Sequence, residues 1–126
     1  EKSMAVLFEH VEFPDSWEGQ MNRLMLMLFY STGMRLSELV TMKETQFDLS
    51  RSNLKILGKG NKERIIPVND ELKAAIKIYL LAKKEKFDSG ADQVLLVNEA
   101  GRALHPRYVQ QKVKFYLSLV TTAEKK

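Results

Sequence analysis

The spacing of apolar residues along the chain predicts four helices, with a group of short strands between the second and the third. The first helix starts at Trp17, after a turn in which Asp15 or Ser16 is expected to cap it. From residue 24 to residue 30 every position is apolar or aromatic, as in a helix that is buried on all sides. Gly33 is expected to end this helix, and a short second helix follows with Leu39 on its apolar face.

A change to strand periodicity follows the second helix. Three strands are predicted, with polar turns between them, at residues 47–49, 54–57 and 64–68. Because Pro67 cannot donate a hydrogen bond to a strand ladder, the last strand is expected at an edge of the sheet or to end there. At the start of the chain, residues 4–13 are expected to form a short strand or an extended lead-in.

Two further helices are predicted in the second half of the chain. The first is capped by Asn69 or Asp70, and its apolar stripe consists of Leu72, Ala75, Ile76, Tyr79 and Leu80. Residues 94–97 are expected to be a short buried strand or an extended segment. The last helix starts at Pro106, and its inner face is expected to hold Val109, Val113, Tyr116, Leu117 and Val120. Residues 121–126 are expected to be a polar linker, and residues 1–126 one domain of the α+β class.

Composition narrows the classes of function. There is no cysteine, which excludes disulfides, a thiol nucleophile and Cys-based metal sites, and the two histidines are too few for most histidine metal sites. Twenty Lys and Arg against sixteen Asp and Glu give a net charge of +4, which permits a polyanionic partner but also fits a lysine-rich solvated surface. The longest apolar run, residues 24–30, is far shorter than the roughly 20 residues needed to span a bilayer. The first residues lack the pattern of a signal peptide, so a cytoplasmic protein without a membrane partner is expected.

Residues 31–39, Ser-Thr-Gly-Met-Arg-Leu-Ser-Glu-Leu, place an arginine at the junction of two packed helices. Arg35 and Glu38 are three residues apart and therefore share a helix face. A guanidinium held at such a junction offers a planar fork that suits two phosphate oxygens, and Glu38 can hold that fork or balance its charge. The alternative for this segment is an ordinary surface Arg–Glu pair.

Residues 57–64, Leu-Gly-Lys-Gly-Asn-Lys-Glu-Arg, place Lys59 between two glycines at the tip of a predicted hairpin. The glycines let the backbone and the lysine approach a phosphate closely, and Lys62 and Arg64 add positive charge nearby. The alternative is a flexible turn that happens to carry lysine. The segment is not a phosphate-binding P-loop, because that motif needs four residues between its glycines and a strand-to-helix setting.

Together, the two segments resemble the catalytic domain of the tyrosine recombinases, the phage-integrase family, and most closely its bacterial Xer-like members. In that family a Thr-Gly-x-Arg-x-Ser-Glu-Leu segment carries the first catalytic arginine, and a Gly-Lys-Gly-x-Lys-x-Arg hairpin carries the catalytic lysine. Both segments occur here in that order, and a weaker resemblance extends from about residue 15 to about residue 120. It implies a mostly helical α+β catalytic domain with a small three-stranded antiparallel sheet.

The resemblance implies that Arg35 and Lys59 are catalytic, with Glu38 as a supporting acid and Lys62 and Arg64 as DNA-binding residues. The implied reaction is site-specific recombination of double-stranded DNA, in which a tyrosine hydroxyl attacks a phosphodiester to give a 3′-phosphotyrosine and a free 5′-hydroxyl. Arg35 is then expected to neutralise charge on the pentavalent phosphorus, and Lys59 to protonate the leaving 5′ oxygen. No metal or other cofactor is implied, because side chains supply the charge that Mg²⁺ supplies in other phosphoryl-transfer enzymes.

The chain departs from the family pattern where a His-x-x-Arg box, a second His or Trp, and the nucleophilic Tyr should follow. His105 does not replace that box, because its segment starts a helix upstream of the expected place and has the wrong spacing. Tyr30, Tyr79, Tyr108 and Tyr116 are expected to be packing residues. We therefore expect a catalytic domain that is incomplete at its C-terminus and does not cleave DNA alone, from a parent that acts as a tetramer on two duplexes.

Two other functions stay open at this point, a non-catalytic nucleic-acid-binding module and a plain interaction domain with a basic surface. The recombinase interpretation depends on one spatial condition. The guanidinium that opens the second helix and the ammonium on the glycine-bracketed turn must converge on the same backbone phosphate.

Overall fold

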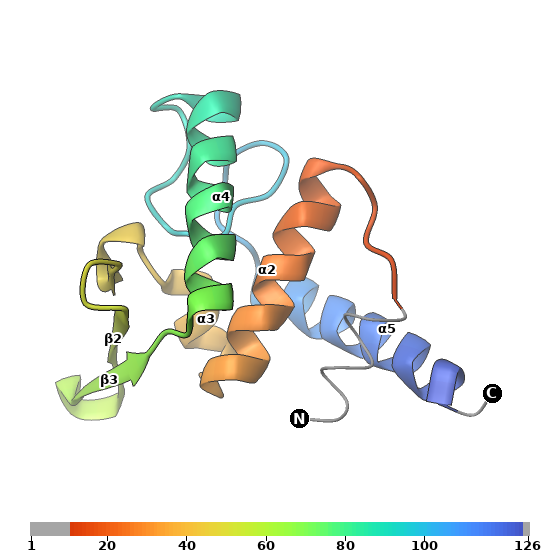
Figure 1. Cartoon of the computed structure of the whole chain (residues 1–126), viewed down its shortest axis with the longest axis horizontal. Coiled ribbons are helices and arrows are strands. Elements are labelled where there is room, and N and C mark those ends of the chain that lie inside the picture. Colours follow the sequence, from red (N-terminus) through yellow and green to blue (C-terminus); the bar gives the residue numbers. More distant parts are fainter. Residues whose placement is uncertain (1–10, 125–126) are drawn as a thin grey trace.

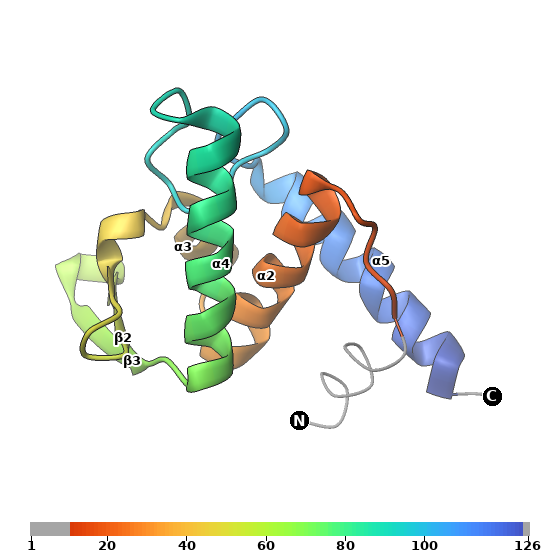
Figure 2. The same ribbon diagram turned by 45° about the horizontal axis from the view of Figure 1, so that its top comes forward.

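A computed structural model describes residues 11–124 of the chain, apart from the side chains of Lys59 and of residues 121–124. Its elements are α2 (Trp17–Thr32), α3 (Leu36–Thr41), the 3-10 turn η1 (Glu44–Gln46), β1 (Phe47–Asp48), β2 (Asn53–Leu57), the 3-10 turn η2 (Lys59–Asn61), β3 (Glu63–Pro67), α4 (Asp70–Phe87) and α5 (Pro106–Glu124). The sheet lies at one end of the molecule and α5 at the other, with α2 and α4 between them (Figure 1). Figure 2 shows the same order from a second direction. The predicted α+β class is confirmed.

The helix α2 forms the centre of the core. Ser16 caps it by accepting a hydrogen bond from the backbone N–H of Gly19. Residues 24–28 are all buried, so the helix is enclosed on every side, as the continuous apolar run predicts. It packs against α4 and α3. Gly33 ends it in the left-handed region, at φ 66°, where a residue without a Cβ is favoured.

The sheet is antiparallel, with strand order β1-β2-β3. Leu54 and Ile56 of β2 are buried, whereas Lys55 and Leu57 are exposed, so one face of the sheet packs on the core. β3 is an edge strand, and Pro67 is its last residue, as predicted. The three strands differ from the predicted ranges by a single residue at one or both ends.

The buried segment at residues 95–97 contacts both α2 and α4. Residues 95–97 are fully or almost fully buried, and this part of the chain makes isolated bridges rather than a regular strand. The indole N–H of Trp17 donates to the carbonyl of Val97 at 3.0 Å, and the backbone N–H of Val97 donates to the Tyr79 hydroxyl at 3.1 Å. The aromatic rings of Trp17 and Tyr79 also pack together, with centroids 5.1 Å apart. Two side chains from different helices thus hold this segment in the core.

The helix α5 differs from its prediction in two respects. Val109, Tyr116 and Val120 are buried on one stripe, as expected. Leu117 is exposed, so its predicted place on the inner face is wrong, because it lies about 100° around the helix from Tyr116. The helix also continues to Glu124, which corrects the linker expected from residue 121. The remaining two residues of that expected linker lie outside the described residues.

The start of the described chain is extended but belongs to no strand. Residues 11–13 have no regular secondary structure, and Phe13 packs on Tyr116 of α5 with ring centroids 4.6 Å apart. The rest of the predicted lead-in, residues 4–10, lies outside the described residues. None of the helices in the described part of the chain has the length and apolar content to cross a membrane.

A buried lysine links α4 to the neighbouring loops. The Lys83 side chain is only 5% exposed. Its ammonium donates to the Glu44 carboxylate and to the carbonyl oxygens of Asp92 and Val94. Three acceptors match the three donors of an ammonium, so the charge is both paired and fully hydrogen-bonded.

Lys83→Met is expected to lower the free energy of unfolding by about 3 kcal/mol, because two carbonyls lose their donor and Glu44 loses its counter-ion. Urea denaturation at pH 7 measures this loss. Lys86→Met is the matched control. Lys86 lies on the same helix and forms a surface ion pair with Glu99, and such pairs contribute about 1 kcal/mol or less. Equal losses in the two variants would contradict the structural role of Lys83.

Candidate functional site

The junction between α2 and α3 holds the backbone of Arg35 in place. The Thr32 hydroxyl donates to the carbonyl of Leu28 at 2.6 Å and accepts the backbone N–H of Met34 at 3.3 Å. Gly33 makes the turn, and the Met34 side chain is buried. The residues on the N-terminal side of Arg35 are therefore anchored by hydrogen bonds, a left-handed glycine and core packing.

Arg35 itself occupies the N-cap position of α3, and its backbone N–H donates to Glu38 Oε1 at 2.9 Å. Its side chain is exposed. Among the residues that the structure describes, its guanidinium has no hydrogen-bonding or ion-pair partner. Glu38 thus holds the backbone of Arg35 rather than its guanidinium fork, which leaves the fork available to an external anion.

Glu38 also binds the hairpin. Its side chain is only 10% exposed, and Arg64 Nη2 of β3 donates to the same Oε1 at 3.2 Å. The pKa of the Glu38 carboxyl is lowered, mainly by the hydrogen bond from the Arg35 backbone. Burial opposes this shift, and the hydrogen bond of Arg64 and the charges of Arg64 and Arg35 add to it. One carboxylate therefore connects the start of α3 to the β2–β3 hairpin.

The hairpin places Lys59 at its tip. The last strand pair is Leu57–Glu63, and the backbone N–H of Gly58 donates to the carbonyl of Lys62 at 2.8 Å. Gly60 has φ 74°, which favours glycine, whereas Gly58 has φ −95° and needs no special residue for its conformation. A Cβ on Gly58 would lie 3.8 Å from Glu38 Oε2, so the hairpin backbone next to Lys59 lies beside Glu38.

The structure therefore brings together four parts of the predicted site. They are the backbone of Arg35, the side chains of Glu38 and Arg64, and the backbone around Lys59. Lys62 is exposed on the same hairpin. Convergence of Arg35 and Lys59 on one phosphate stays a prediction. The pairing of Glu38 with Arg64 was missed, since the two residues are 26 positions apart and no local pattern indicates the contact.

His105 enters α5, as predicted. Its carbonyl accepts the backbone N–H of Tyr108 at 3.0 Å, and its Nδ1 accepts the backbone N–H of Arg107 at 3.0 Å. The imidazole therefore satisfies one backbone donor at the first turn of the helix, where no intrahelical acceptor exists.

The four tyrosines pack as predicted. Tyr79 and Tyr116 are buried in the core, and Tyr30 is half-buried at the end of α2. The hydroxyl of Tyr108 donates to Glu18 of α2 at 2.7 Å, and burial raises the pKa of this hydroxyl. Each ring thus contributes to contacts between elements.

Comparison with known proteins decides the family. The sequence profile of the phage integrase family matches residues 6–124. The chain belongs to this family. Tyrosine recombinase XerC of Staphylococcus saprophyticus is 43% identical over 110 residues, which cover 87% of this chain and 36% of that protein. The chain thus spans about a third of the length of the curated relatives it matches.

Solved structures of integrase-family members share the fold. The XerH site-specific recombinase bound to its difH substrate superposes with a TM-score of 0.79 at 23% identity, over 95% of this chain and 34% of that one. A lambda integrase tetramer bound to a Holliday junction gives a TM-score of 0.64 at 16% identity, over 94% of this chain and 33% of that one. The helices and small sheet described above therefore share the fold of the matching part of these two proteins.

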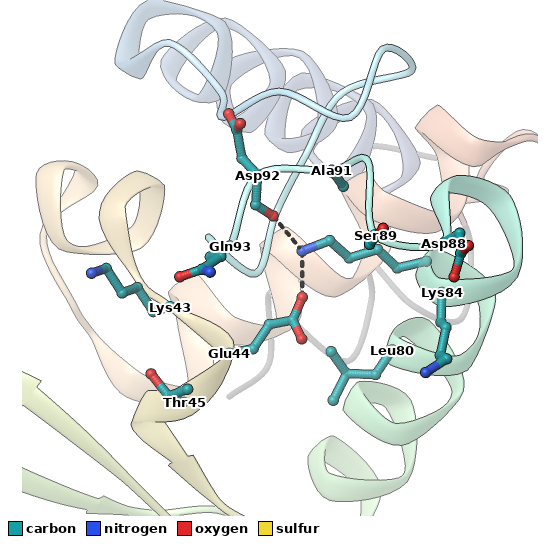
Figure 3. A pocket seen from close by; sticks show the side chains of 11 residues that line it. Lys43, Glu44, Thr45, Leu80, Lys84, Asp88, Ser89, Ala91, Asp92 and Gln93 are labelled. Carbon is teal, nitrogen blue, oxygen red and sulfur yellow. Dashed lines mark hydrogen bonds and ion pairs between the residues drawn. The ribbon is translucent and has the colours of Figure 1, made fainter.

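A cavity in this integrase-family domain lies apart from the candidate site. It has a volume of about 380 Å³, and its lining includes Lys43, Glu44, Asp88, Asp92 and Gln93 (Figure 3). None of the five predicted site residues lines it. Within residues 11–124 no group of three His, Cys, Asp or Glu side chains is placed to hold a metal ion. At the candidate site, the side chains of Arg35, Lys62 and Arg64 are exposed, so their positive charges can meet an external anion.

Glu38→Gln is expected to lower the free energy of unfolding by about 1 kcal/mol at pH 7, because a neutral amide accepts weaker hydrogen bonds than a carboxylate. The pKa of Glu38 is lowered in the folded state, so its stabilising effect is present above the ordinary carboxyl pKa and is lost as the pH falls through the folded-state pKa. The difference between wild type and variant should therefore shrink between pH 7 and about pH 3 in urea denaturation.

The control for this pH dependence is Glu99→Gln, which removes a carboxylate from the exposed pair with Lys86. It should change stability little at either pH. A stability difference for Glu38→Gln that stays constant from pH 7 to about pH 3 would show that the carboxylate charge does not hold the hairpin to α3.

Proposed function

We propose that this chain is part of the catalytic domain of a site-specific DNA recombinase, in which Arg35 and Lys59 act on the same phosphodiester. The observation that carries this proposal is the Glu38 carboxylate, which binds the backbone of Arg35 and the guanidinium of the hairpin residue Arg64. Membership of the phage integrase family and likeness to relatives named tyrosine recombinase XerC support it. Double-stranded DNA is the proposed partner, consistent with the substrate-bound XerH neighbour.

The proposed chemistry is a transesterification. A tyrosine oxygen attacks the phosphorus, a bond to the 3′-phosphate forms, and the bond to the 5′ oxygen breaks. Arg35 offsets the negative charge that builds on the phosphate oxygens, with a guanidinium that its exposed position leaves open to DNA. Lys59 donates a proton to the departing 5′ oxygen, which leaves as a hydroxyl.

DNA binding is assigned to the same surface. Lys62 is exposed on the hairpin, and the Arg64 side chain, which is paired with Glu38, stays 46% exposed, so both can contact phosphates that flank the reacting one. Such contacts release counter-ions, so the affinity should fall steeply with salt concentration. We propose no metal, because Arg35 and Lys59 supply the positive charge that the reaction needs.

The nucleophilic tyrosine is proposed to lie outside these 126 residues. All four tyrosines here are engaged in packing between elements, and the curated relatives are more than twice as long as this chain. The chain is therefore proposed as the first part of a catalytic domain in a longer recombinase. That recombinase is proposed to act as a tetramer on two duplexes, the assembly size of the lambda integrase neighbour.

Arg35→Ala is expected to reduce the yield of covalent protein–DNA adduct by about 100-fold, because a fixed charge at the transition state is lost. The measurement uses a nicked suicide substrate and a full-length recombinase that contains this chain, natural or as a chimaera with an XerC relative. Arg35→Lys should retain more activity than Arg35→Ala, since it keeps the charge but not the fork.

Arg102→Ala is the control, because Arg102 is an exposed arginine paired with Asp92 in another part of the fold. This variant should form adduct at the wild-type level. An unchanged adduct yield in Arg35→Ala would remove Arg35 from the phosphate site and with it the proposed function.

Lys59→Ala is expected to lose cleavage of ordinary DNA but to recover it on DNA with a 5′-phosphorothiolate link. A thiolate leaves without a proton, so the proposed general acid is not needed there. Arg35→Ala should show no such recovery, because charge neutralisation at phosphorus is needed with either leaving group. Failure of Lys59→Ala to recover would contradict its role as the acid.

A further inference from the structure

Arg64 projects from the inner face of the sheet. The register pairs Arg64 with Ile56 of β2, and paired residues on antiparallel strands project from the same face. Ile56 is buried in the core, whereas the adjacent pair, Lys55 and Ile65, is exposed on the other face. The Arg64 side chain therefore leaves the sheet on the side of the helices rather than on the solvent side.

On that side, the guanidinium reaches Glu38 of α3. Arg64 Nη2 lies 3.2 Å from Glu38 Oε1. A Cβ built on Gly58 would lie 3.7 Å from Arg64 Nη1 and 3.8 Å from Glu38 Oε2. The Arg64–Glu38 contact thus packs directly against the residue that precedes Lys59.

The geometry points to Arg64 as a positioning residue, which acts through Glu38 to hold the hairpin that carries Lys59 against the helix that begins after Arg35. This inference rests on the proposed function and deepens it. Arg35 and Lys59 act on one phosphate only if their backbones keep a constant separation, and a misplacement of about 1 Å in such a group can cost about 100-fold in rate. Arg64 therefore contributes to the reaction without touching the reacting phosphate.

This pair differs from an ordinary surface ion pair, which contributes little to any structure. The Glu38 carboxylate is mostly shielded from solvent and is already held by the backbone N–H of Arg35, so its position is set before Arg64 binds it. The pair also joins α3 to the hairpin directly beside Gly58, the residue before Lys59. Loss of the pair is therefore expected to let the hairpin tip, with Lys59, move relative to α3.

The chain offers a matched control in the Arg102–Asp92 pair. Asp92 accepts the backbone N–H of Ala103 at 2.9 Å and the guanidinium of Arg102 at 3.3 Å. This repeats the two hydrogen bonds of Glu38, one from a backbone and one from an arginine. Because neither residue belongs to the candidate site, Arg102→Ala removes an arginine–carboxylate contact of the same type, though a more exposed one, without disturbing the hairpin.

The contact is tested first in the 126-residue chain, by an NMR pH titration that follows the backbone amide of Arg35. Glu38 accepts the hydrogen bond of this amide, so its chemical shift reports the ionisation of the carboxylate. Arg64→Ala should move the midpoint to higher pH, and Arg102→Ala should leave it in place. An unchanged midpoint in Arg64→Ala overturns the inference. Arg64→Gln, which keeps the size and a donor, takes its place if circular dichroism shows that Arg64→Ala does not fold.

The role in the reaction is tested in the full-length recombinase, by single-turnover cleavage at saturating DNA. Arg64→Ala should lower the saturated rate by about 10-fold or more, while Arg102→Ala keeps the wild-type rate. In a Glu38→Gln background, Arg64→Ala should cost less, because the carboxylate through which it acts is gone.

The outcomes separate this inference from the proposed function. If Arg64→Ala weakens only DNA affinity and keeps the saturated rate, while Arg35→Ala abolishes cleavage, the inference is overturned and the proposed function stands. If Arg35→Ala itself cleaves at the wild-type rate, the proposed function fails, whatever Arg64→Ala does.

Discussion

The carboxylate of Glu38 is the contact on which the arrangement of the candidate site depends. Arg35, Lys59, Lys62 and Arg64 all carry positive charge, and such groups repel one another when they are brought close together. Glu38 offsets part of this repulsion from a shielded position between the two segments, where it binds the backbone of one and the guanidinium of the other. Because its two hydrogen bonds are both made to groups other than the Arg35 guanidinium, that cation stays free to bind an anion from outside.

The helix α2 supplies the rigid support behind this contact. Its residues 24–28 are all buried, and the hydroxyl of Thr32 bonds to the backbone on both sides of Gly33, in the turn before α3. These contacts fix the backbone of Arg35, whereas its exposed guanidinium makes no hydrogen bond or ion pair with the described residues. The packing of the core and the proposed chemistry are therefore linked through the few residues at the end of α2.

Other buried polar contacts organise the half of the fold beyond the sheet. Lys83 joins α4 to the loops around it, and Trp17 and Tyr79 hold the buried segment at Val97. The cavity that opens beside Lys83 is lined by both acidic and basic side chains, several of which are already paired (Figure 3). These contacts stabilise the domain away from the candidate site, where the Glu38–Arg64 pair links the hairpin to α3.

The sequence by itself determined the order of the elements and the helix end at Gly33, limited the helix caps to Asp15 or Ser16 and to Asn69 or Asp70, and indicated the edge position of β3 and the resemblance to the integrase family. Each of these depends on a local pattern, such as a capping side chain, a left-handed glycine, a proline or a short motif, which is readable without the rest of the fold. Only the tertiary structure decided that Leu117 is exposed, that α5 continues to Glu124, and that Glu38 binds Arg64 instead of the guanidinium of Arg35. These features depend on which surfaces meet when segments distant in the sequence pack together, and neither periodicity nor motif spacing contains that information.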